Sequence, residues 1–583
     1  MKCKILISDK SYQNYNFVNA ETNEDILLEN EKVDPVKEKL FTKDIFSIEN
    51  GHLSLLYSHV RSGITIAGVL MLENNKTFGR TSNKKRLLYK CIPDDKHLPS
   101  FLVPYEVKIG FSKVQKNKYV IFKFDHWDSL HPQGFLLETL GDVGDPNVFY
   151  EYQLYCKNLH VSITNFTNKT KELFLKKSND EYIQQILKNP NFHIEDRRDQ
   201  HIFSIDPVNS LDFDDAFGLI EKEDGSCIVS IYIANVYFWL EILHLWKSFS
   251  SRVSTIYLPD RRRPMLPTIL SDNLCSLQQN ETRFAFVMDV FLDKDHNIIK
   301  TEYKNSVIQV YKNYRYEESD LLYNCPKYNK LLEITMKQDE KMINSHDVVA
   351  FWMVYMNKTC GLWMMEKQIG VFRSVYYKNK YVFESLETNK ELDVLPPETQ
   401  RVIKTWNNTA GQYVVYNQNA VLEHEIMKMK CYIHITSPIR RIIDLLNQIW
   451  IMKEMNLISN LSQDSIDFFQ NWLHKMDYIN DSMRTIRKVQ TDCEIIHQFF
   501  TQLYDSTCES NNEMMNQQYQ GTVFGKIVKN DGSIHYMVFI ESIQLLARIN
   551  THVNVPNYSK QSFKIFLFED EHKVKKMIRL QIL

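Results

Sequence analysis

Three features are scarce or missing in the 583-residue sequence, and each absence excludes a class of protein. The ten cysteines include no C-x-x-C pair, which argues against a zinc ribbon and a disulfide framework and predicts reduced thiols. The longest apolar run, GITIAGVLML at 63–72, is about half as long as a membrane span, so we expect a buried strand there. Neither charge dominates: the formal net charge is −2, so any nucleic-acid surface must be local.

The sequence does contain enough apolar material for several hydrophobic cores. Hydrophobic residues make up 44% of the chain, and its length predicts about four domains. The first arginine is Arg61 and acidic residues are frequent before it, which is atypical of a mitochondrial transit peptide. We therefore expect a soluble, cytoplasmic protein without a membrane segment, and we leave a nuclear location open.

The pattern of apolar residues divides the chain into barrel-like and helical parts. Residues 1–50 show little periodicity and receive no assignment. Short alternating segments then predict two small β-barrels of the OB or cold-shock type, at 51–110 and 111–194. Mixed and then helical patterns predict a larger α/β domain at 195–507, and alternation returns in a third barrel at 517–583. The expected fold class is multidomain α+β, with small barrels flanking a mixed α/β catalytic domain.

A basic loop, NNKTFGRTSNKKRLLYK at 74–90, lies inside the first predicted barrel. It is either a solvated charge run or a surface for single-stranded nucleic acid, where cations meet phosphates and rings such as Phe78 and Tyr89 stack on bases. The sequence does not decide between these two interpretations.

The most unusual stretch is SIDPVNSLDFDDAF at 204–217, which places four aspartates among apolar residues. Like charges about 5 Å apart repel by about 3 kcal/mol at an effective dielectric of about 20, so converging carboxylates need a cation or must protonate. The alternative is a solvated turn. Alternating apolar residues favour a half-buried extended segment that must bend if all four are to meet. The four aspartates are Asp206, Asp212, Asp214 and Asp215.

A second candidate is the predicted helix start in CYIHITSPIRRIIDLLNQIW. Ser437 is a favourable N-cap and Pro438 suits the first helical position. Arg440 and Arg441 then lie in the first turn, where the positive end of the helix dipole disfavours cations. A bound phosphate would offset that cost. The alternative is that these arginines pair with structural carboxylates such as Asp444.

A third stretch, STIYLPDRRRPMLPTILSDNLCSLQQNETRFAF, has neither helical nor strand periodicity. Tyr257 lies just before a turn that a proline fixes, and three consecutive arginines follow it. An isolated tyrosine is usually a core residue. Beside an acid cluster and an anion-binding helix, the alternative is a platform on which a base stacks.

The three stretches, and their order along the chain, resemble the RNase II/RNB family of processive 3′-to-5′ exoribonucleases. The family's acidic signature is matched by Asp206, Asp212, Asp214, Asp215 and Ala216. Its Tyr-Leu-Pro, Met-Leu-Pro and Cys-Ser-Leu block is matched by Tyr257 to Pro259, Met265 to Pro267 and Cys275 to Leu277. Its helix-opening signature is matched by His434, Thr436, Ser437, Pro438, Ile439, Arg440, Arg441 and Asp444.

The resemblance extends beyond these motifs. The stretch DHWDSLHPQGFLLETLGDVGD is similar to the second cold-shock domain of the eukaryotic branch, which includes the exosome's catalytic subunit. The tail at 517–583 is similar to the family's terminal OB domain. Because residues 1–50 alone precede the first predicted barrel, we expect no N-terminal endonuclease domain. The Asn- and Lys-rich composition suggests an AT-rich genome, such as a viral one.

The sequence also departs from the family pattern. The family's Glu pair before a helical Met-and-Asn motif is replaced by Ala350 and Phe351. The arginine-rich turn retains Arg373 but lacks the His-Pro that usually follows, and an expected Tyr after the double arginine is Ile442. These departures leave the four aspartates and Arg440 in place, but their effect on the RNA path and on the rate is not predictable from the sequence.

The resemblance implies hydrolysis of single-stranded RNA to nucleoside 5′-monophosphates. It also implies that the four aspartates hold one or two Mg²⁺ or Mn²⁺ ions and that Arg440 stabilises charge on the phosphate. The implied RNA-binding residues are Tyr257, Tyr316, Arg373, Ser437 and Arg441. A monomer is expected, and the sequence names no protein partner. The alternative is a catalytically weak or inactive RNB-like RNA-binding protein; a structural scaffold, a third hypothesis, needs no convergent charges.

Overall fold

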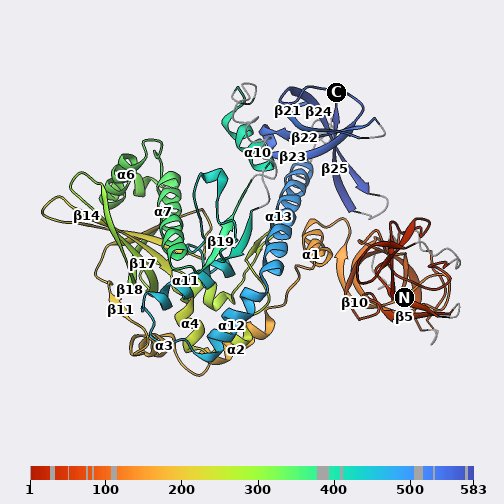
Figure 1. The fold of residues 1–583 in the computed structure, drawn as a ribbon, viewed down its shortest axis with the longest axis horizontal. Coiled ribbons are helices and arrows are strands. Elements are labelled where there is room, and N and C mark those ends of the chain that lie inside the picture. The colour runs from red at the N-terminus through yellow and green to blue at the C-terminus, as the bar shows by residue number, and fades with distance from the viewer. Residues whose placement is uncertain are drawn as a thin grey trace. The chain divides into compact units, whose positions relative to one another are not determined.

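The computed structural model describes residues 2–26, 33–49, 52–73, 76–81, 85–106, 115–376, 392, 394–407, 411–504, 517–529, 532–570 and 575–583. It divides into two compact units, and Figure 1 shows their elements. The first unit comprises Met1–His160, Leu258–Asp260 and Lys488–Leu583. The second comprises Val161–Tyr257 and Arg261–Arg487.

The first unit begins with a five-stranded antiparallel sheet, in the order β3-β2-β1-β4-β5. A closed barrel follows, in the order β10-β8-β7-β6-β9. The strands are β1 (Lys2–Ile7), β2 (Tyr15–Asn19), β3 (Asp25–Ile26), β4 (Ile45–Glu49), β5 (His52–Tyr57), β6 (Ile66–Leu70), β7 (Leu87–Pro93), β8 (Phe101–Tyr105), β9 (Lys118–His126) and β10 (Gln133–Asp142).

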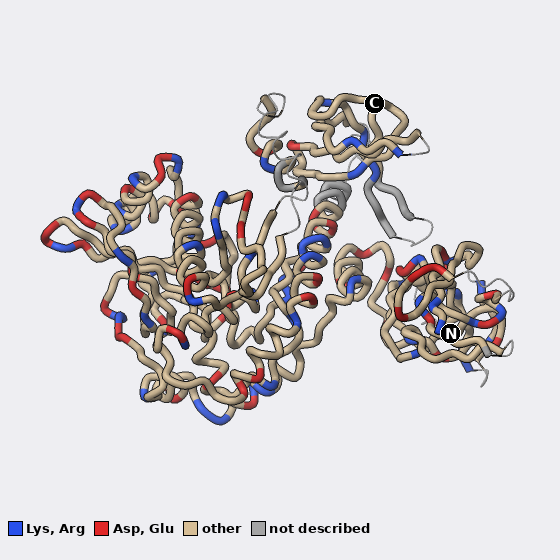
Figure 2. The backbone as a smooth tube through the Cα atoms, in the orientation of Figure 1, with Lys and Arg blue, Asp and Glu red and all other residues tan. Residues whose placement is uncertain are grey.

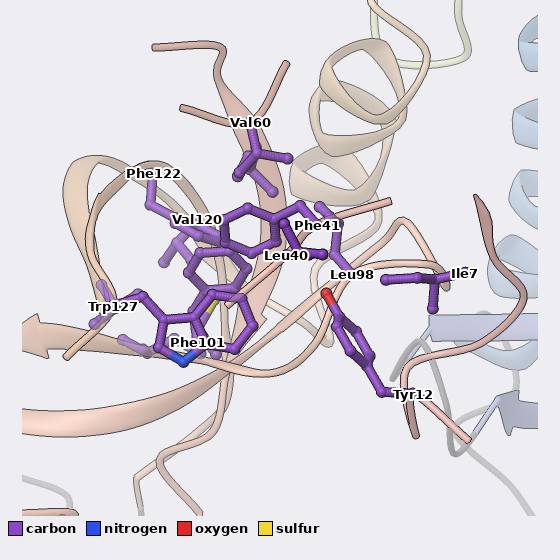
Figure 3. Packing of buried hydrophobic residues seen from close by; sticks show 14 of the residues in the cluster. Ile7, Tyr12, Leu40, Phe41, Val60, Leu98, Phe101, Val120, Phe122 and Trp127 are labelled. Carbon is purple, nitrogen blue, oxygen red and sulfur yellow. The ribbon is translucent and has the colours of Figure 1, made fainter. Parts of the chain in front are cut away.

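The sheet and the barrel share one hydrophobic core, which Figure 3 shows from close by. The ring of Phe41, from the segment between β3 and β4, is stacked parallel to Phe101 of β8 with centroids 5.9 Å apart. The ring of Trp127, just after β9, lies 4.9 Å from Phe41. Burial of large aromatic rings contributes strongly to stability, so these contacts join the two sheets into one structural body.

The boundaries predicted for the first two barrels differ from those of the structure. Residues 1–50, which the sequence pattern left unassigned, contain β1 to β4, and β5 pairs with β4 across the predicted boundary. The predicted division at residue 110 falls inside the closed barrel, because β6 pairs with β9 beyond it. Local periodicity does not show which strands pair over long separations. The domain names therefore stay predictions.

The residues expected to complete a second barrel, up to 194, are helical instead. The helices are α1 (Pro146–Cys156), α2 (Thr164–Phe174) and α3 (Asn179–Leu187). In the first unit, α1 packs against β6, β9 and β10, and Tyr152 stacks on Tyr119 with ring centroids 4.1 Å apart. The capping box formed by Ser178 and Glu181 fixes the start of α3.

The second unit is built on a six-stranded sheet in the order β11-β18-β12-β13-β14-β17, and β17 also pairs with β18. Two small sheets, β15-β16 and β19-β20, accompany it. The strands are β11 (Ile194–Asp196), β12 (Ile202–Asp206), β13 (Asp215–Glu221), β14 (Cys227–Ala234), β15 (Ile256–Tyr257), β16 (Arg262–Arg263), β17 (Thr282–Leu292), β18 (Ile298–Arg315), β19 (Val371–Ser374) and β20 (Gln412–Val415).

Helices complete the second unit, and α6 packs against β13 while α5 packs against β18. The α-helices are α4 (Val236–Ile242), α5 (Ser319–Asn324), α6 (Pro326–Gln338), α7 (Ser345–Glu366), α10 (Pro397–Asn407), α11 (Ile442–Glu454), α12 (Gln463–His474) and α13 (Met476–Tyr504), the last of which continues into the first unit. Shorter turns are η1 (Trp246–Ser248), the π-helix η2 (Leu270–Leu274) and η3 (Glu425–Met427).

Helix prediction from apolar periodicity agrees well with the second unit. Apolar residues predict a helix at 348–368, which is α7, and helices over much of 463–505, which contains α12 and α13. The sequence pattern also predicts a strand at 227–240, and this prediction is wrong in its second half. Asn235 ends the strand, because its side chain accepts a hydrogen bond from the backbone N–H of Phe238 and caps α4.

The tail forms a five-stranded antiparallel sheet in the order β23-β22-β21-β24-β25 with its own hydrophobic core. Its elements are β21 (Tyr519–Val528), β22 (Ile534–Ile540), η5 (Glu541–Ile543), β23 (Leu545–Thr551), β24 (Lys560–Asp570) and β25 (Lys575–Ile582). The predicted fold class, small barrel-like sheets flanking a mixed α/β domain, is confirmed. Figure 2 shows that acidic and basic residues are interspersed along the chain. Among the described residues, no helix has the length and apolarity to cross a membrane.

Candidate active site

One cavity of about 740 Å³ in the second unit collects side chains from all three stretches that the sequence singles out. It is open on one side and lies where β12, β13, β15, β16 and the turn before α11 meet. Its lining includes Asp206, Asp212, Asp214, Asp215, Tyr257, Arg262, Tyr316, Val349, Met353, Asn357, Tyr432, His434, Thr436, Ser437, Arg440 and Arg441.

The acidic stretch reaches the cavity because the chain turns sharply inside it. β12 ends at Asp206 and β13 begins at Asp215, and these two strands are antiparallel neighbours in the sheet. Between them Asn209 has a φ of 70°, a left-handed conformation that asparagine tolerates better than most residues. The expectation of one extended segment is therefore wrong, and the expected bend is present. It leaves Leu211 exposed while Phe213 is buried.

Asp214 is bonded through both carboxylate oxygens. Its Oδ1 accepts the backbone N–H of Ile439 at 3.0 Å, and its Oδ2 accepts Nε–H of Arg440 at 3.0 Å. Burial raises the pKa of Asp214 to about 7, although the guanidinium of Arg440 opposes that rise. Asp214 thus fixes both the backbone and the side chain of the turn before α11.

Asp212 is engaged from the β15-β16 hairpin. Its Oδ2 accepts the hydroxyl hydrogen bond of Tyr257 at 3.1 Å, and its Oδ1 lies 2.6 Å from Nη1 of Arg262. Tyr257 and Arg262 are paired across the two strands, so the hairpin grips one carboxylate from two neighbouring positions. Asp212 therefore holds the hairpin, and with it Tyr257, at the cavity.

Asp206 and Asp215 are the open members of the cluster. Oδ2 of Asp206 is buried and has no hydrogen-bond partner among the described residues. Burial raises the pKa of Asp206 to about 6, and burial followed by the charges of Asp206 and Asp214 raises the pKa of Asp215 well above its ordinary range. Such carboxylates either take up protons or share a cation.

These two carboxylates fit a divalent cation that needs few protein ligands. Within the described residues, no three His, Cys, Asp or Glu side chains come close enough together to hold a metal ion by themselves. Mg²⁺, however, is commonly bound by one or two carboxylates together with substrate phosphates and water. The unpartnered buried oxygen of Asp206 is a suitable ligand atom for it. That all four aspartates hold metal stays a prediction.

The start of α11 differs from the prediction. The helix begins at Ile442 rather than at Pro438, and the N-cap is the extended residue Arg441 rather than Ser437. The reason is tertiary: the backbone N–H of Ser437 donates to Oδ1 of Asp444 at 2.8 Å, and a β-bridge joins Arg441 to Ser254. Carboxylates of the protein itself therefore accept the backbone N–H groups of this turn to which a bound anion was expected to bind.

The two arginines of this turn have different partners. Arg441 donates to Asp444 at 2.8 Å, which is the structural pairing considered as the alternative. Arg440 instead contacts Asp214 and donates from Nη2 to Oγ of Ser437 at 3.1 Å. Burial lowers the pKa of Arg440, but the nearby acids, Asp214 first, raise it overall, so its guanidinium stays charged beside the cavity.

Two tyrosines offer ring faces at the cavity. Tyr257 is 38% exposed. The ring of Tyr316 is stacked on His346, with centroids 3.7 Å apart and planes 9° from parallel, so one of its faces is already covered. Its backbone N–H donates to the carbonyl of Asp206 at 3.1 Å, which ties the ring to the acid cluster.

Arg373 is the one RNA-binding candidate that does not line this cavity. Its guanidinium lies 5.0 Å from the ring centre of Tyr413 and donates to the carbonyl of Gly411. No described Asp or Glu forms an ion pair with it, and burial lowers its pKa. A partly buried cation without an anion is costly, so this position favours an anionic ligand.

The motifs did not identify several residues of the cavity as site residues. Arg262 is one of three consecutive arginines, and only the pairing of β15 with β16 selects it. On α7, Val349, Met353 and Asn357 are spaced four residues apart and so share one face. That spacing is visible in the sequence, but only the structure shows that the face borders the acids.

A comparison with protein-family models matches residues 194–333 to the RNB domain. The match agrees with the resemblance to the RNase II/RNB family that the motifs predict. It includes the four aspartates, Tyr257 and Tyr316, whereas Arg373 and the turn before α11 lie outside the matched residues.

Individual proteins are also similar to this chain. The human exosome complex exonuclease RRP44 is 28% identical over 253 residues, which are 43% of this chain and 25% of that protein. The chain thus matches about a quarter of that relative's length. Mycoplasma genitalium RNase R, solved with ribose-methylated single-stranded RNA, covers 100% of both chains at a TM-score of 0.70 and 16% identity.

A third similar structure is that of yeast Ssd1, described as a pseudonuclease. It covers 97% of this chain and 80% of its own at a TM-score of 0.58 and 15% identity. At such identities these structural likenesses establish the fold alone. None of these three proteins comes from a virus, so they lend no support to the expected viral source.

Proposed function

We propose that the protein is a processive 3′-to-5′ exoribonuclease that hydrolyses single-stranded RNA to nucleoside 5′-monophosphates with Mg²⁺. In each cycle the oxygen of water bonds to phosphorus and the P–O3′ bond breaks. The released nucleotide keeps the phosphate on its 5′ carbon, and the shortened strand gains a proton on its 3′ oxygen.

One observation carries this proposal: four aspartates and a charged guanidinium line the same cavity as two tyrosine rings. A binding surface for RNA needs cations, because phosphates are negative. Buried aspartates repel RNA and are costly without a cation, so their presence favours chemistry on the phosphate over binding alone.

Within the proposal, Asp206 and Asp215 hold the metal, because their carboxylates have no ion-pair partner among the described residues. When bound, Mg²⁺ would supply Lewis-acid activation of water and positive charge for the phosphate. Asp212 and Asp214 instead form ion pairs with Arg262 and Arg440.

The remaining residues orient the RNA. Arg440, anchored through Nε by Asp214, would donate to the scissile phosphate and stabilise the charge that develops there. Tyr257 and the free face of Tyr316 would stack on the terminal bases, which gives little base preference because every base has a π-face. Arg373 and Arg441 would contact phosphates further along the strand.

The second candidate function is an RNA-binding protein without turnover. The likeness to the pseudonuclease Ssd1 favours it, as does the loss of the family's Glu pair at Ala350 and Phe351. Against it, all four aspartates are present and line one cavity.

A labelled substrate distinguishes the two. A 5′-labelled oligo(A) is incubated with the protein and either Mg²⁺, Mn²⁺ or EDTA. The expected result is conversion of the full-length RNA to a short end product with few intermediates, and EDTA should abolish it. Asp214→Asn, which removes charge with almost no change of volume, is expected to abolish hydrolysis and keep RNA binding. If the parent protein binds the labelled RNA but does not shorten it, the second candidate function is established and the first is refuted.

A further inference from the structure

Arg262 enters the cavity from a different element than Arg440. It lies on β16 opposite Tyr257 of β15, and its side chain is 19% exposed. Nη1 forms the ion pair with Asp212 described above. Each strand of the hairpin is only two residues long. The contacts of the Arg262 side chain therefore set the position of its guanidinium as well as the backbone does.

A second carboxylate fixes the other side of the guanidinium. Nη2 of Arg262 lies 2.5 Å from Oδ2 of Asp272, on the π-helix η2. The other oxygen of Asp272 accepts the hydroxyl hydrogen bond of Ser271 at 2.5 Å, and its carbonyl accepts the side-chain amide of Gln278. Asp272 is therefore held in place on both its side chain and its backbone, and it holds Arg262 in turn.

Arg262 retains hydrogen-bonding capacity on the side that faces the acids. Nη1 is buried close to Asp212, but among the described residues it has no acceptor aligned for a hydrogen bond. The ion pair with Asp212 thus lacks an aligned hydrogen bond, and a phosphate oxygen in the cavity would offer this donor a better aligned acceptor. A guanidinium that is anchored through Nη2 and held at Nη1 by charge alone suits such an oxygen.

We propose that Arg262 is a further phosphate-binding arginine of the cavity and that Asp272 is its positioning residue. The proposal rests on the proposed function, because it takes RNA as the ligand of this cavity. A phosphate that approaches four aspartates needs compensating cations near its oxygens. Asp214 holds Arg440 in the turn before α11, on one element of the cavity. Arg262 supplies a cation from the β15-β16 hairpin, and Asp272 holds its guanidinium at the cavity.

The test is a double-mutant cycle between the protein and the RNA. Short RNAs each carry one neutral methylphosphonate linkage on a 2′-deoxy sugar, either at the 3′-terminal linkage, at the next linkage, or at a distant upstream one. Their dissociation constants are measured by fluorescence anisotropy in EDTA, so that no cleavage intervenes. The proteins are the full-length parent, Arg262→Ala, Arg262→Lys, and the matched control Arg261→Ala, whose side chain does not line the cavity.

We expect one of the two linkages nearest the 3′ end to be coupled to Arg262. Neutralising that linkage should weaken the parent's affinity about tenfold, as expected for one charge-assisted phosphate contact. Arg262→Ala should weaken binding of the fully charged RNA by a similar factor. In this variant, neutralising that linkage should not change the dissociation constant further, whereas neutralising the other linkages should still do so. Arg262→Lys should recover part of the affinity. Arg261→Ala should behave as the parent does.

The role of Asp272 has its own readout. Asp272→Asn should reduce the coupling between Arg262 and the neutral linkage, and it should have no further effect in the Arg262→Ala background, because it acts only through that arginine. Asp272→Glu should restore part of the coupling. Thermal melting of each variant separates this from a general loss of stability, which would lower the melting temperature and leave the coupling unchanged.

Two outcomes overturn the inference. If Arg262→Ala and Arg262→Lys both remain as sensitive as the parent to every neutral linkage, Arg262 contacts no phosphate near the 3′ end and only secures Asp212. If Asp272→Asn still changes binding in the Arg262→Ala background, Asp272 is not a positioning residue for Arg262. Because the cycle measures binding without cleavage, it can succeed even where the oligo(A) assay refutes nuclease activity, so the two failures are distinguishable.

Discussion

At the scale of single residues, the four aspartates of the acidic stretch have two different environments. Asp212 and Asp214 are bonded to arginines on both sides of the cavity, whereas Asp206 and Asp215 have raised pKa values and no ion-pair partner among the described residues. The same residue type thus supplies anchors for cations and open ligand atoms within one stretch. This division predicts distinct consequences for substitutions at the arginines.

Arg440 is expected to act on the rate more than on binding. Arg440→Ala should lower the single-turnover cleavage rate by about 100-fold or more, a loss of about 3 kcal/mol, with little change in the RNA dissociation constant. Arg440→Lys should recover only part of the rate, because a point charge does not reproduce the planar contact. Rapid-quench cleavage at saturating RNA and anisotropy binding on the same preparations measure both.

A control is needed because Arg440→Ala leaves the buried carboxylate of Asp214 without its partner. The double variant with Asp214→Asn removes that charge and should fold as the parent does, as judged by thermal melting. A folded Arg440→Ala protein that cleaves as fast as the parent would rule out the catalytic role.

His424 should make stability depend on pH. Burial, and next the charge of Arg373, lower the pKa of His424 to about 4, and its buried Nδ1 has no hydrogen-bond partner among the residues that the structure describes. Between pH 6.5, the ordinary pKa of histidine, and about pH 4, this histidine binds a proton in the unfolded chain but not in the folded chain. The free energy of unfolding should therefore fall as the pH is lowered through this window, and this loss should be absent above it.

The variant His424→Gln measures that contribution. In urea unfolding between about pH 7 and pH 4, the pH slope of the unfolding free energy should become shallower by up to about one proton relative to the parent. The comparison cancels other titrating groups that both proteins share. Identical slopes would mean that His424 is not held neutral in the folded protein.

At the scale of elements, the β19-β20 pair positions Arg373 by leaving space for it. A Cβ atom added at Gly411 would lie 2.7 Å from Cζ of Arg373 and 2.8 Å from a methyl group of Val375. The glycine just before β20 is therefore required for the guanidinium to lie against the ring of Tyr413.

Gly411→Ala should accordingly imitate the loss of Arg373. Both Gly411→Ala and Arg373→Ala should weaken RNA binding several-fold and reduce the slope of log affinity against log salt by about 0.7, and the double variant should be no weaker than Arg373→Ala. The matched control is Gly144→Ala, whose added methyl group meets no atom within 4 Å. Normal binding by Gly411→Ala together with weak binding by Arg373→Ala would contradict this positioning.

At the scale of the whole molecule, the tail has its own hydrophobic core, and none of its described residues lines the cavity. Removing residues 517–583 should weaken RNA affinity and flatten its salt dependence, because phosphate contacts outside the cavity are mainly electrostatic. The single-turnover rate at saturating RNA should survive. Gel filtration checks that the truncated protein stays monodisperse, because Ile495 loses part of its cover. Unchanged affinity would leave the tail without this role.

The sequence by itself determined the features that depend on local patterns. Four aspartates at fixed spacing, the apolar pattern of α7 and the apolar run that contains β6 are properties of neighbouring residues, and the structure contains each of them. The resemblance to the RNase II/RNB family rests on the same local motifs, and the match at 194–333 agrees with it.

Only the tertiary structure decided which of these residues are free to act. Asp214 and Arg440 are 226 positions apart, yet their contact separates the roles of the four aspartates. The bridge between Arg441 and the distant Ser254 moves the start of α11 to Ile442. Strand pairing decided where the first two sheets divide. It also decided the position of Arg262, which the sequence pattern alone does not distinguish from Arg261. Hydrogen bonds and ion pairs between distant segments satisfy buried polar groups, and no local pattern in the sequence specifies their partners.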